Sequence, residues 1–170
     1  RETPSGIGSR ESIDLREAYL APGLVDIHIH GSAGVDVQNT DIDGLSSLSE
    51  FLLAEGVTGY FATFVPTGEE NYRSAVATVQ SRFEAQRQSS RGARVLGIHF
   101  EGPFVSRKRC GALQPAHFRT YDGDPRSIDA FVNLQETAEL KRLMTIAPEV
   151  GGGLDLIREL IRRGLRVFIG

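Results

Sequence analysis

The chain has 170 residues, of which 40% are hydrophobic and 24% are charged, and its formal net charge at pH 7 is -3. This length suits one compact domain. The chain has no long basic run, which argues against a nucleic-acid partner. It also has no apolar run near the length of about 20 residues that a membrane helix needs. The single cysteine, Cys110, cannot form an intramolecular disulfide, which fits a reducing compartment, so we expect a cytoplasmic protein.

Strand-like and helix-like segments alternate along the first half of the chain. A strand is expected at 24–30, where Val and Ile dominate, and a helix at 41–56, which Gly56 should end as the residue after the C-cap. The aromatic and β-branched segment 57–66 predicts a second strand. An amphipathic helix is expected at 69–88.

The second half of the chain continues this alternation. Pro125 is favoured at the first position of a helix and marks the start of one after a long loop. The expected elements are a strand at 94–103, a loop at 104–124, a helix at 125–140, a strand at 141–149, a helix at 154–164 and a strand at 165–170.

Five strands that alternate with four helices predict an α/β fold with a parallel sheet and right-handed crossovers. One candidate is a doubly wound, flavodoxin-type sheet, which is complete at this length. The other is a partial (β/α)8 TIM-type barrel, its first five strands and four helices, since a whole barrel needs about 250 residues. Length favours the first candidate, but the chemistry of the strands favours the barrel, which is our prediction.

The strand at 24–30, "LVDIHIH", places two histidines in an aliphatic run. Side chains alternate between the two faces of a strand, so Asp26, His28 and His30 should share one face. The opposite face carries Val25, Ile27 and Ile29. In a barrel this aliphatic face should pack on the outer helices, and the polar face should point inward.

The strand at 94–103 repeats this pattern, because His99 and Glu101 share one face near its C-terminal end. The inward faces of barrel strands meet at the C-terminal mouth, where active sites of this fold lie. In a doubly wound sheet the same ionisable groups would be buried in an apolar layer, which is costly.

Two imidazoles on one strand and a carboxylate on another predict a divalent-metal site. His28, His30 and Glu101 are the predicted ligands. Mixed histidine and carboxylate ligation suits Zn²⁺, our first choice, and also Fe²⁺ or another first-row ion. Asp26 could be a partner of a ligand or a buried structural acid, and we favour the structural role. His99 could be a ligand, a neighbour that orients a ligand or a core residue, and we favour the orienting role.

Several segments together carry a resemblance to a known family. "APGLVDIHIHG" resembles the first barrel strand of the amidohydrolase superfamily. "GVTGYFATFVPT", "GIHFEGPF", "KRCGALQPAH" and "TIAPE" are similar to N-acetylglucosamine-6-phosphate deacetylases, and the similarity runs from about Ile13 to Gly170. The His-x-His pair alone would also fit dihydroorotases, ureases and many other hydrolases. "HFEGPF", followed by a "GA…P" loop and the strand end "APE", is fairly specific to the deacetylases.

This resemblance implies a metal-dependent barrel enzyme that hydrolyses the acetamide of N-acetylglucosamine 6-phosphate to glucosamine 6-phosphate and acetate. Residues 1–22 would be a lead-in and the remnant of a small β-domain, and residues 23–170 the N-terminal part of the barrel. Glu101 matches the family's metal-binding glutamate. His28 and His30 match the pair that binds an additional metal in some members.

The resemblance also implies a substrate contact in the loop after the third strand. Ala112 and Leu113 match the positions that contact the phosphorylated amino sugar. Many members have Ala-His at this point, so Leu113 departs from the pattern. The side-chain hydrogen bond to the sugar is then lost, supplied by Gln114 or replaced by backbone contacts.

Other groups of the family's site have no match in this sequence. In the family, further histidine ligands follow the strand that corresponds to 165–170. This sequence has no match for those histidines, for the groups that bind the phosphate or for the aspartate that transfers protons. We therefore assign no catalytic residue and expect the chain to be inactive by itself. A five-strand arc exposes two sheet edges, so we also expect a homo-oligomer.

Two other functions remain open at this point. One is another amidohydrolase, acting on a cyclic amide or a different N-acyl sugar. The other is a non-enzymatic, five-stranded α/β binding module that holds no metal.

Overall fold

A computed structural model describes residues 14–88, 91–132 and 139–170. Its main feature is one sheet in which five parallel strands lie in the order β1-β4-β5-β6-β7. The strands are β1 (Leu24–Ile29), β4 (Val57–Phe64), β5 (Arg94–Glu101), β6 (Lys141–Ile146) and β7 (Arg166–Ile169). The sheet is curled into a half-barrel, which confirms the predicted partial TIM-type barrel.

The strand order excludes the doubly wound alternative. A flavodoxin-type sheet reverses its strand order at a switch point, so that helices cover both faces. Here spatial neighbours in the main sheet follow one another in chain order without reversal. Right-handed crossovers in one direction place the helices on one face, the outside of the curl.

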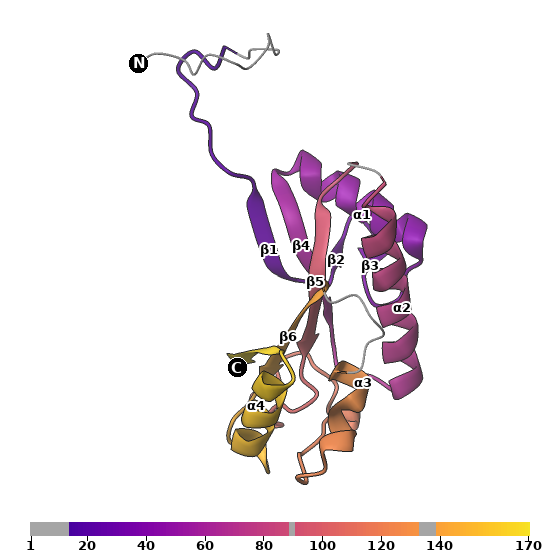
Figure 1. Ribbon diagram of the computed structural model, residues 1–170, viewed down its shortest axis with the longest axis vertical. Coiled ribbons are helices and arrows are strands. Elements are labelled where there is room, and N and C mark those ends of the chain that lie inside the picture. The colour runs from indigo at the N-terminus through magenta and orange to yellow at the C-terminus, as the bar shows by residue number, and fades with distance from the viewer. Residues whose placement is uncertain (1–13, 89–90, 133–138) are drawn as a thin grey trace.

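The helices lie on this outer face (Figure 1). Their bounds are α1 (Ile42–Ala54), α2 (Glu69–Ala85), α3 (Asp129–Val132) and α4 (Gly153–Arg162). Asp41 caps α1, because its side chain accepts a hydrogen bond of 2.8 Å from the Gly44 amide. Gly56 follows the C-cap with φ +84°, a conformation that glycine adopts without strain, as its predicted position required.

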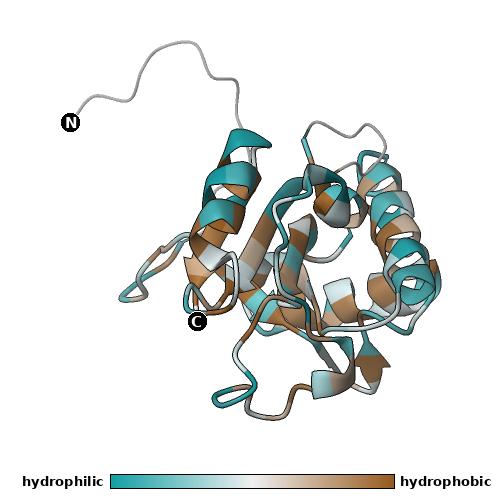
Figure 2. Cartoon of the chain, turned by 90° about the horizontal axis from the view of Figure 1, so that it is seen from below, coloured by the Kyte–Doolittle hydropathy of each residue, from teal (hydrophilic) through white to brown (hydrophobic). Residues whose placement is uncertain are grey.

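The hydrophobic core lies between the outer face of the sheet and the helices, including α3 and α4. The helices α1 and α2 pack on β4 and β5 and on each other. Figure 2 shows hydrophobic residues on the sides of these helices that face the strands. The buried helical positions include Leu45, Leu48, Leu52, Tyr72, Val76, Val79 and Phe83. Ile42 and Leu53 lie at the margins of the apolar side of α1 and are 38% and 43% exposed.

The predicted packing of the aliphatic face of β1 is wrong in part. Val25 and Ile27 are 55% and 49% exposed, and only Ile29 packs against the core. These side chains are exposed because β1 is the edge strand of the sheet. The helices α1 and α2 pack on β4 and β5 and do not cover it.

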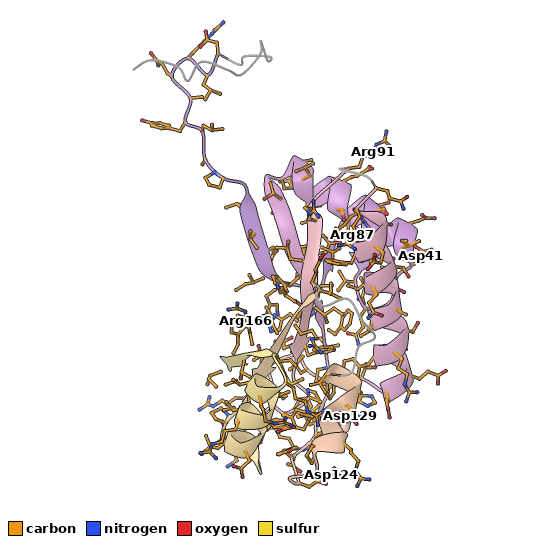
Figure 3. The ribbon with its side chains drawn as sticks, viewed as in Figure 1. Asp41, Arg87, Arg91, Asp124, Asp129 and Arg166 are labelled. Carbon is orange, nitrogen blue, oxygen red and sulfur yellow. The ribbon has the colours of Figure 1, made fainter. Side chains whose placement is uncertain are left out.

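The region predicted as a helix at 125–140 is shorter and more irregular. It begins with a 3₁₀ turn, η2 (Pro125–Ile128), and continues as α3, while residues 133–138 lie outside the described part. Asp129, labelled in Figure 3, forms a 2.7 Å ion pair with Arg163 at the end of α4. This ion pair ties the two segments together.

Two small elements were not predicted. A short antiparallel pair, β2 (Gly31–Ser32) and β3 (Val35–Asp36), directly follows β1. Its turn has positive φ at both Ala33 (51°) and Gly34 (82°), which is the geometry of a tight hairpin. A 3₁₀ turn, η1 (Pro115–His117), lies in the long loop after β5. Within the described ranges, no helix is long and apolar enough to cross a membrane.

Candidate metal centre

The three predicted metal ligands converge on one point inside the curl of the sheet. His28 lies on β1, His30 directly follows that strand, and Glu101 ends β5. One donor atom from each lies within 4.8 Å of the others. The Nε2 atoms of the two histidines are 3.1 Å apart, and Glu101 Oε2 lies 3.2 Å from His30 Nε2 and 3.7 Å from His28 Nε2.

These separations fit the donor set of a small divalent ion. Two ligand atoms bound tetrahedrally at about 2.0–2.1 Å are about 3.3 Å apart, within the range seen here. Two neutral imidazoles with one carboxylate are also a common donor set for Zn²⁺ and Fe²⁺. The arrangement can therefore accept an ion with small adjustments of side-chain rotamers.

The main chain of β4 orients His30. His30 Nδ1 lies 3.2 Å from the Thr63 carbonyl oxygen, and the Thr63 hydroxyl accepts a 3.0 Å hydrogen bond from the Ile29 amide. When Nδ1 donates to this carbonyl, Nε2 carries the lone pair and faces Glu101. Metal-binding histidines are generally held in this way by a partner on their other nitrogen.

His99 lies beside the cluster, and both of its ring nitrogens have other partners. Nδ1 is 2.9 Å from the Ile27 carbonyl oxygen, and Nε2 is 2.8 Å from the Thr145 hydroxyl. The ring is 1% exposed and meets the His28 ring edge to face, with centroids 4.9 Å apart. Asp26, interpreted as a structural acid, accepts a 3.0 Å hydrogen bond from the His28 amide.

The close contact between His30 and Glu101 perturbs both groups. The hydrogen bond to Glu101 is the main cause that raises the pKa of His30, and partial burial opposes it. The same bond lowers the pKa of Glu101, so this carboxyl stays ionised at neutral pH. Burial is the main cause that lowers the pKa of His99, which keeps its ring neutral.

Two glycines with positive φ turn the chain away directly after the donors. Gly31 follows His30 with φ +144°, and a Cβ there would lie 1.9 Å from the Val35 carbonyl oxygen. Gly102 follows Glu101 with φ +86°. Both turns leave the donor side chains at the ends of their strands, which is where the barrel prediction placed them.

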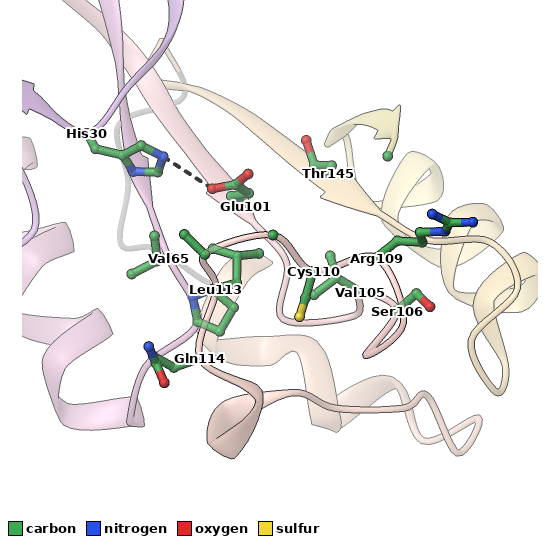
Figure 4. Close-up of a pocket in the computed structure, with 14 residues that line it drawn as sticks. His30, Val65, Glu101, Val105, Ser106, Arg109, Cys110, Leu113, Gln114 and Thr145 are labelled. Atoms are coloured by element: carbon green, nitrogen blue, oxygen red, sulfur yellow. Dashed lines mark ion pairs between the residues drawn. The ribbon is translucent and has the colours of Figure 1, made fainter.

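A cavity of about 500 Å³ opens next to the cluster, and His30 and Glu101 form part of its wall. Figure 4 shows these two side chains directed toward each other, with Leu113 and Gln114 on the loop nearby. Ala112, predicted to contact the sugar with Leu113, also lines the cavity. Two of the three predicted metal ligands and both predicted sugar contacts, which are distant in sequence, therefore line one cavity, while His28 lies outside its wall.

Thr63 and Thr145, which contact His30 and His99, were missed by the sequence reasoning, as was Arg109, a cation on the cavity wall. The threonines lie on strands that were correctly expected. Nothing local to either residue indicates which histidine it contacts, because that depends on the register between strands.

Known proteins with similar sequences include N-acetylglucosamine-6-phosphate deacetylases from several organisms. N-acetylglucosamine-6-phosphate deacetylase of Homo sapiens is 36% identical over 166 residues, covering 94% of this chain and 38% of the human protein. The enzyme of the same name from Bacillus subtilis (strain 168) is 36% identical over 160 residues, covering 94% of this chain and 39% of that protein. No family model matches the chain.

A solved structure agrees with these sequence matches. An N-acetyl-D-glucosamine-6-phosphate deacetylase mutant from Mycobacterium smegmatis, in complex with N-acetyl-D-glucosamine-6-phosphate, superposes with a TM-score of 0.71 at 32% identity. The match covers 88% of this chain and 36% of that protein. The chain thus spans less than half the length of the relatives that it matches.

Proposed function

We propose that this chain, which belongs to the N-acetylglucosamine-6-phosphate deacetylase family, carries part of the metal centre and part of the sugar site of such an enzyme. The reaction is hydrolysis of the acetamide of N-acetylglucosamine 6-phosphate, which yields glucosamine 6-phosphate and acetate. The observation that carries the proposal is the convergence of His28, His30 and Glu101 beside a cavity lined by Ala112 and Leu113.

In this proposal the three converging side chains hold a divalent cation. His28 and His30 offer Nε2 and Glu101 offers Oε2, with Zn²⁺ as the first choice of ion and Fe²⁺ as the second. A cation at this position supplies Lewis-acid activation of the amide carbonyl and of the attacking water. The carbonyl of Thr63 keeps the His30 ring in the required orientation.

The cavity next to these donors would receive the sugar. Leu113 and Ala112 offer apolar contact, and the Gln114 amide lines the same wall and can hydrogen-bond a sugar hydroxyl. Among the described residues we assign no group that transfers protons in the reaction. The chain alone should therefore bind the ion but release no acetate.

A chimera tests the function. The 160-residue matching segment of the Bacillus subtilis deacetylase would be replaced by the corresponding part of this chain. We expect the purified, Zn²⁺-loaded chimera to release acetate from N-acetylglucosamine 6-phosphate. Substitution of Glu101 by Ala in the chimera should lower the rate at least about 100-fold, the scale of losing a group that stabilises the transition state.

The same chimera separates the competing substrates. The panel contains the 4-epimeric phosphorylated sugar, unphosphorylated N-acetylglucosamine and a cyclic amide. A folded chimera, judged by circular dichroism, that prefers a cyclic amide would show that the chain comes from a different amidohydrolase. A folded chimera with no activity on any of these compounds would contradict the proposed function.

We also propose that the chain associates into a homo-oligomer. The support is the exposure of apolar side chains at the two edges of the main sheet. Leu24 on β1 and Ile169 on β7 are 65% and 64% exposed. Strand edges with exposed apolar side chains favour association.

A further inference from the structure

We propose that His99 is a positioning residue that holds His28 in the orientation needed to bind the metal. This inference rests on the proposed function for its importance, since it concerns the same metal centre. His99 itself offers no free nitrogen to an ion, because both ring nitrogens already have partners within the protein.

His99 joins three strands of the half-barrel. It lies on β5 and contacts the Ile27 carbonyl oxygen on β1 through Nδ1, at 2.9 Å, and the Thr145 hydroxyl on β6 through Nε2, at 2.8 Å. Strands β1 and β5 are not neighbours, since β4 lies between them. The His99 side chain therefore reaches across the inside of the curl to hold β1.

The contact point on β1 is directly connected to a metal donor. The Ile27 carbonyl belongs to the peptide unit whose nitrogen is that of His28. Fixing this carbonyl fixes the peptide plane, and with it the direction in which the His28 side chain leaves the backbone. The His99 ring also meets the His28 ring edge to face, with an interplanar angle of 85°, and limits its rotation.

Strand pairing alone leaves this part of β1 poorly defined. The register between β1 and β4 shifts between Asp26 and Ile29, the interval that contains His28. The other edge of β1 has no strand partner among the described residues. The contact from the buried His99 ring is thus one of the side-chain constraints on the backbone here, beside the 3.0 Å hydrogen bond that the His28 amide donates to Asp26, and the His28 side chain itself is 42% exposed.

Two substitutions at one position test the proposal. His99→Leu removes both hydrogen bonds while keeping an apolar side chain. His99→Asn keeps an amide nitrogen near the position of Nδ1, so it can still donate to the Ile27 carbonyl. We expect His99→Leu to weaken Zn²⁺ binding by about 10–100-fold, the usual cost of losing a partner that orients a ligand, and to change the visible spectrum of the Co²⁺-loaded chain. His99→Asn should restore most of the affinity and the spectrum.

A matched control separates positioning from general loss of stability. Gln86 is 5% exposed, and its side chain makes two 2.9 Å hydrogen bonds to the backbone of Val95, near the opposite end of β5. Gln86→Leu should lower the unfolding midpoint in urea and leave the Co²⁺ spectrum unchanged. Equal losses of affinity in Gln86→Leu and His99→Leu, or wild-type affinity in His99→Leu, would overturn the proposal.

A second measurement does not depend on metal. The chain contains 4 histidines, which long-range ¹H–¹⁵N spectra can resolve. In the metal-free chain we expect His99 as the Nδ1-protonated neutral tautomer, and we expect His99→Leu to broaden or shift His28 while His117 is unchanged. Unaltered His28 signals would refute the positioning role. If the wild-type chain bound neither Zn²⁺ nor Co²⁺, the proposed function would fail, and these spectra would still decide the role of His99.

Discussion

At the scale of single residues, a proton and a metal ion compete for the same atoms. His30 Nε2 faces Glu101 Oε2 at 3.2 Å, so a proton on His30 makes a good ion pair with this carboxylate. That ion pair is the main reason why the pKa of His30 is raised. An ion that binds the cluster must displace this proton, because imidazole binds metal only in its neutral form.

Zn²⁺ affinity should therefore fall as the pH falls. Below the raised pKa of His30, affinity should drop by about tenfold per pH unit for each proton displaced. Glu101 should contribute little to this slope above pH 5, since its pKa is lowered. Isothermal titration with Zn²⁺ at several pH values between 5.5 and 8 measures the slope. His117→Gln, at an exposed histidine outside the cluster, should leave the slope unchanged.

The stability of the metal-free chain should change with pH in the opposite sense to the Zn²⁺ affinity. The raised pKa of His30 means that the ion pair stabilises the fold below the ordinary pKa of 6.5, and that this is lost as the pH rises through the raised value. The pKa of Glu101 is lowered, so the stability that its carboxylate contributes is fully present above the ordinary pKa of 4.5. This stability is lost as the pH falls through the lowered pKa. The difference in Tm between the Zn²⁺-loaded and metal-free chain should thus be smaller at pH 6 than at pH 8. A difference that grows toward low pH would show that His30 is not a ligand.

Glu101 should be needed for binding because it supplies the negative charge of the donor set. Glu101→Gln keeps the shape of the side chain but removes that charge, and we expect Zn²⁺ affinity to fall by at least about 100-fold. Glu149→Gln is the matched control, since Glu149 is exposed and lies outside the three-residue cluster. Equal effects of the two substitutions would mean that the ion responds to net charge and not to this cluster.

At the scale of elements, the sequence predicted the pattern of the main sheet well but its margins poorly. Both helices expected in the first half of the chain are present and bury an apolar face, on which Leu48 and Val79 lie, because a 3.6-residue period is a local signal. The burial of Val25 and Ile27 was predicted wrongly, because it depends on whether a helix from elsewhere covers β1. Periodicity within the strand contains no information about that neighbour.

In the candidate site, too, features set by local sequence patterns could be predicted, and contacts set by neighbouring strands could not. The convergence of His28, His30 and Glu101 follows from strand parity and from the rule that barrel sites lie at the C-terminal ends of strands. The contacts that Thr63 and Thr145 make could not be predicted, because they depend on inter-strand register. The β2–β3 pair escaped prediction because each of its strands is only two residues long.

Buried and exposed leucines on α1 offer a direct test of the core. Leu48 is 0% exposed and Leu53 is 43% exposed on the same helix. Leu48→Ala should lower the free energy of unfolding by about 2–5 kcal/mol, the cost of lost burial plus a cavity. Leu53→Ala should cost only about 1 kcal/mol, because nearly half of this residue is already exposed to solvent. Urea unfolding monitored by circular dichroism measures both, and similar costs would show that α1 packs in a different rotation.

At the scale of the whole molecule, the half-barrel leaves apolar surface at both edges of the main sheet. On β7, Phe168 and Ile169 are 36% and 64% exposed, and β1 forms the opposite edge. Backbone groups at such edges can pair with strands of another chain. These two edges are where we expect the proposed association to occur.

We expect self-association that increases with protein concentration and weakens when a charge is placed at an edge. Ile169→Lys should shift the species seen by analytical ultracentrifugation toward monomer without changing Zn²⁺ affinity. Leu154→Lys places the same charge at a residue that is 61% exposed on α4, a helix that packs on β7 but offers no strand edge, and should have a smaller effect. A larger effect of Leu154→Lys would place the contact on the helical face instead.

His28 lies on β1, His30 directly follows it, and Glu101 ends β5, with β4 between these two strands; this arrangement links the candidate metal centre to the curvature of the sheet. In a flat sheet, strands separated by one neighbour are about 9–10 Å apart, and parallel side chains keep that spacing. Here Nε2 of His30 and Oε2 of Glu101 approach to 3.2 Å because the inner face is concave and its side chains lean together. Flattening the sheet would separate these atoms, so an ion bound between them would favour the curled form over flatter ones. The distance between these donor atoms therefore depends on the curvature of the sheet, and it is short only when the strands are curled as they are here.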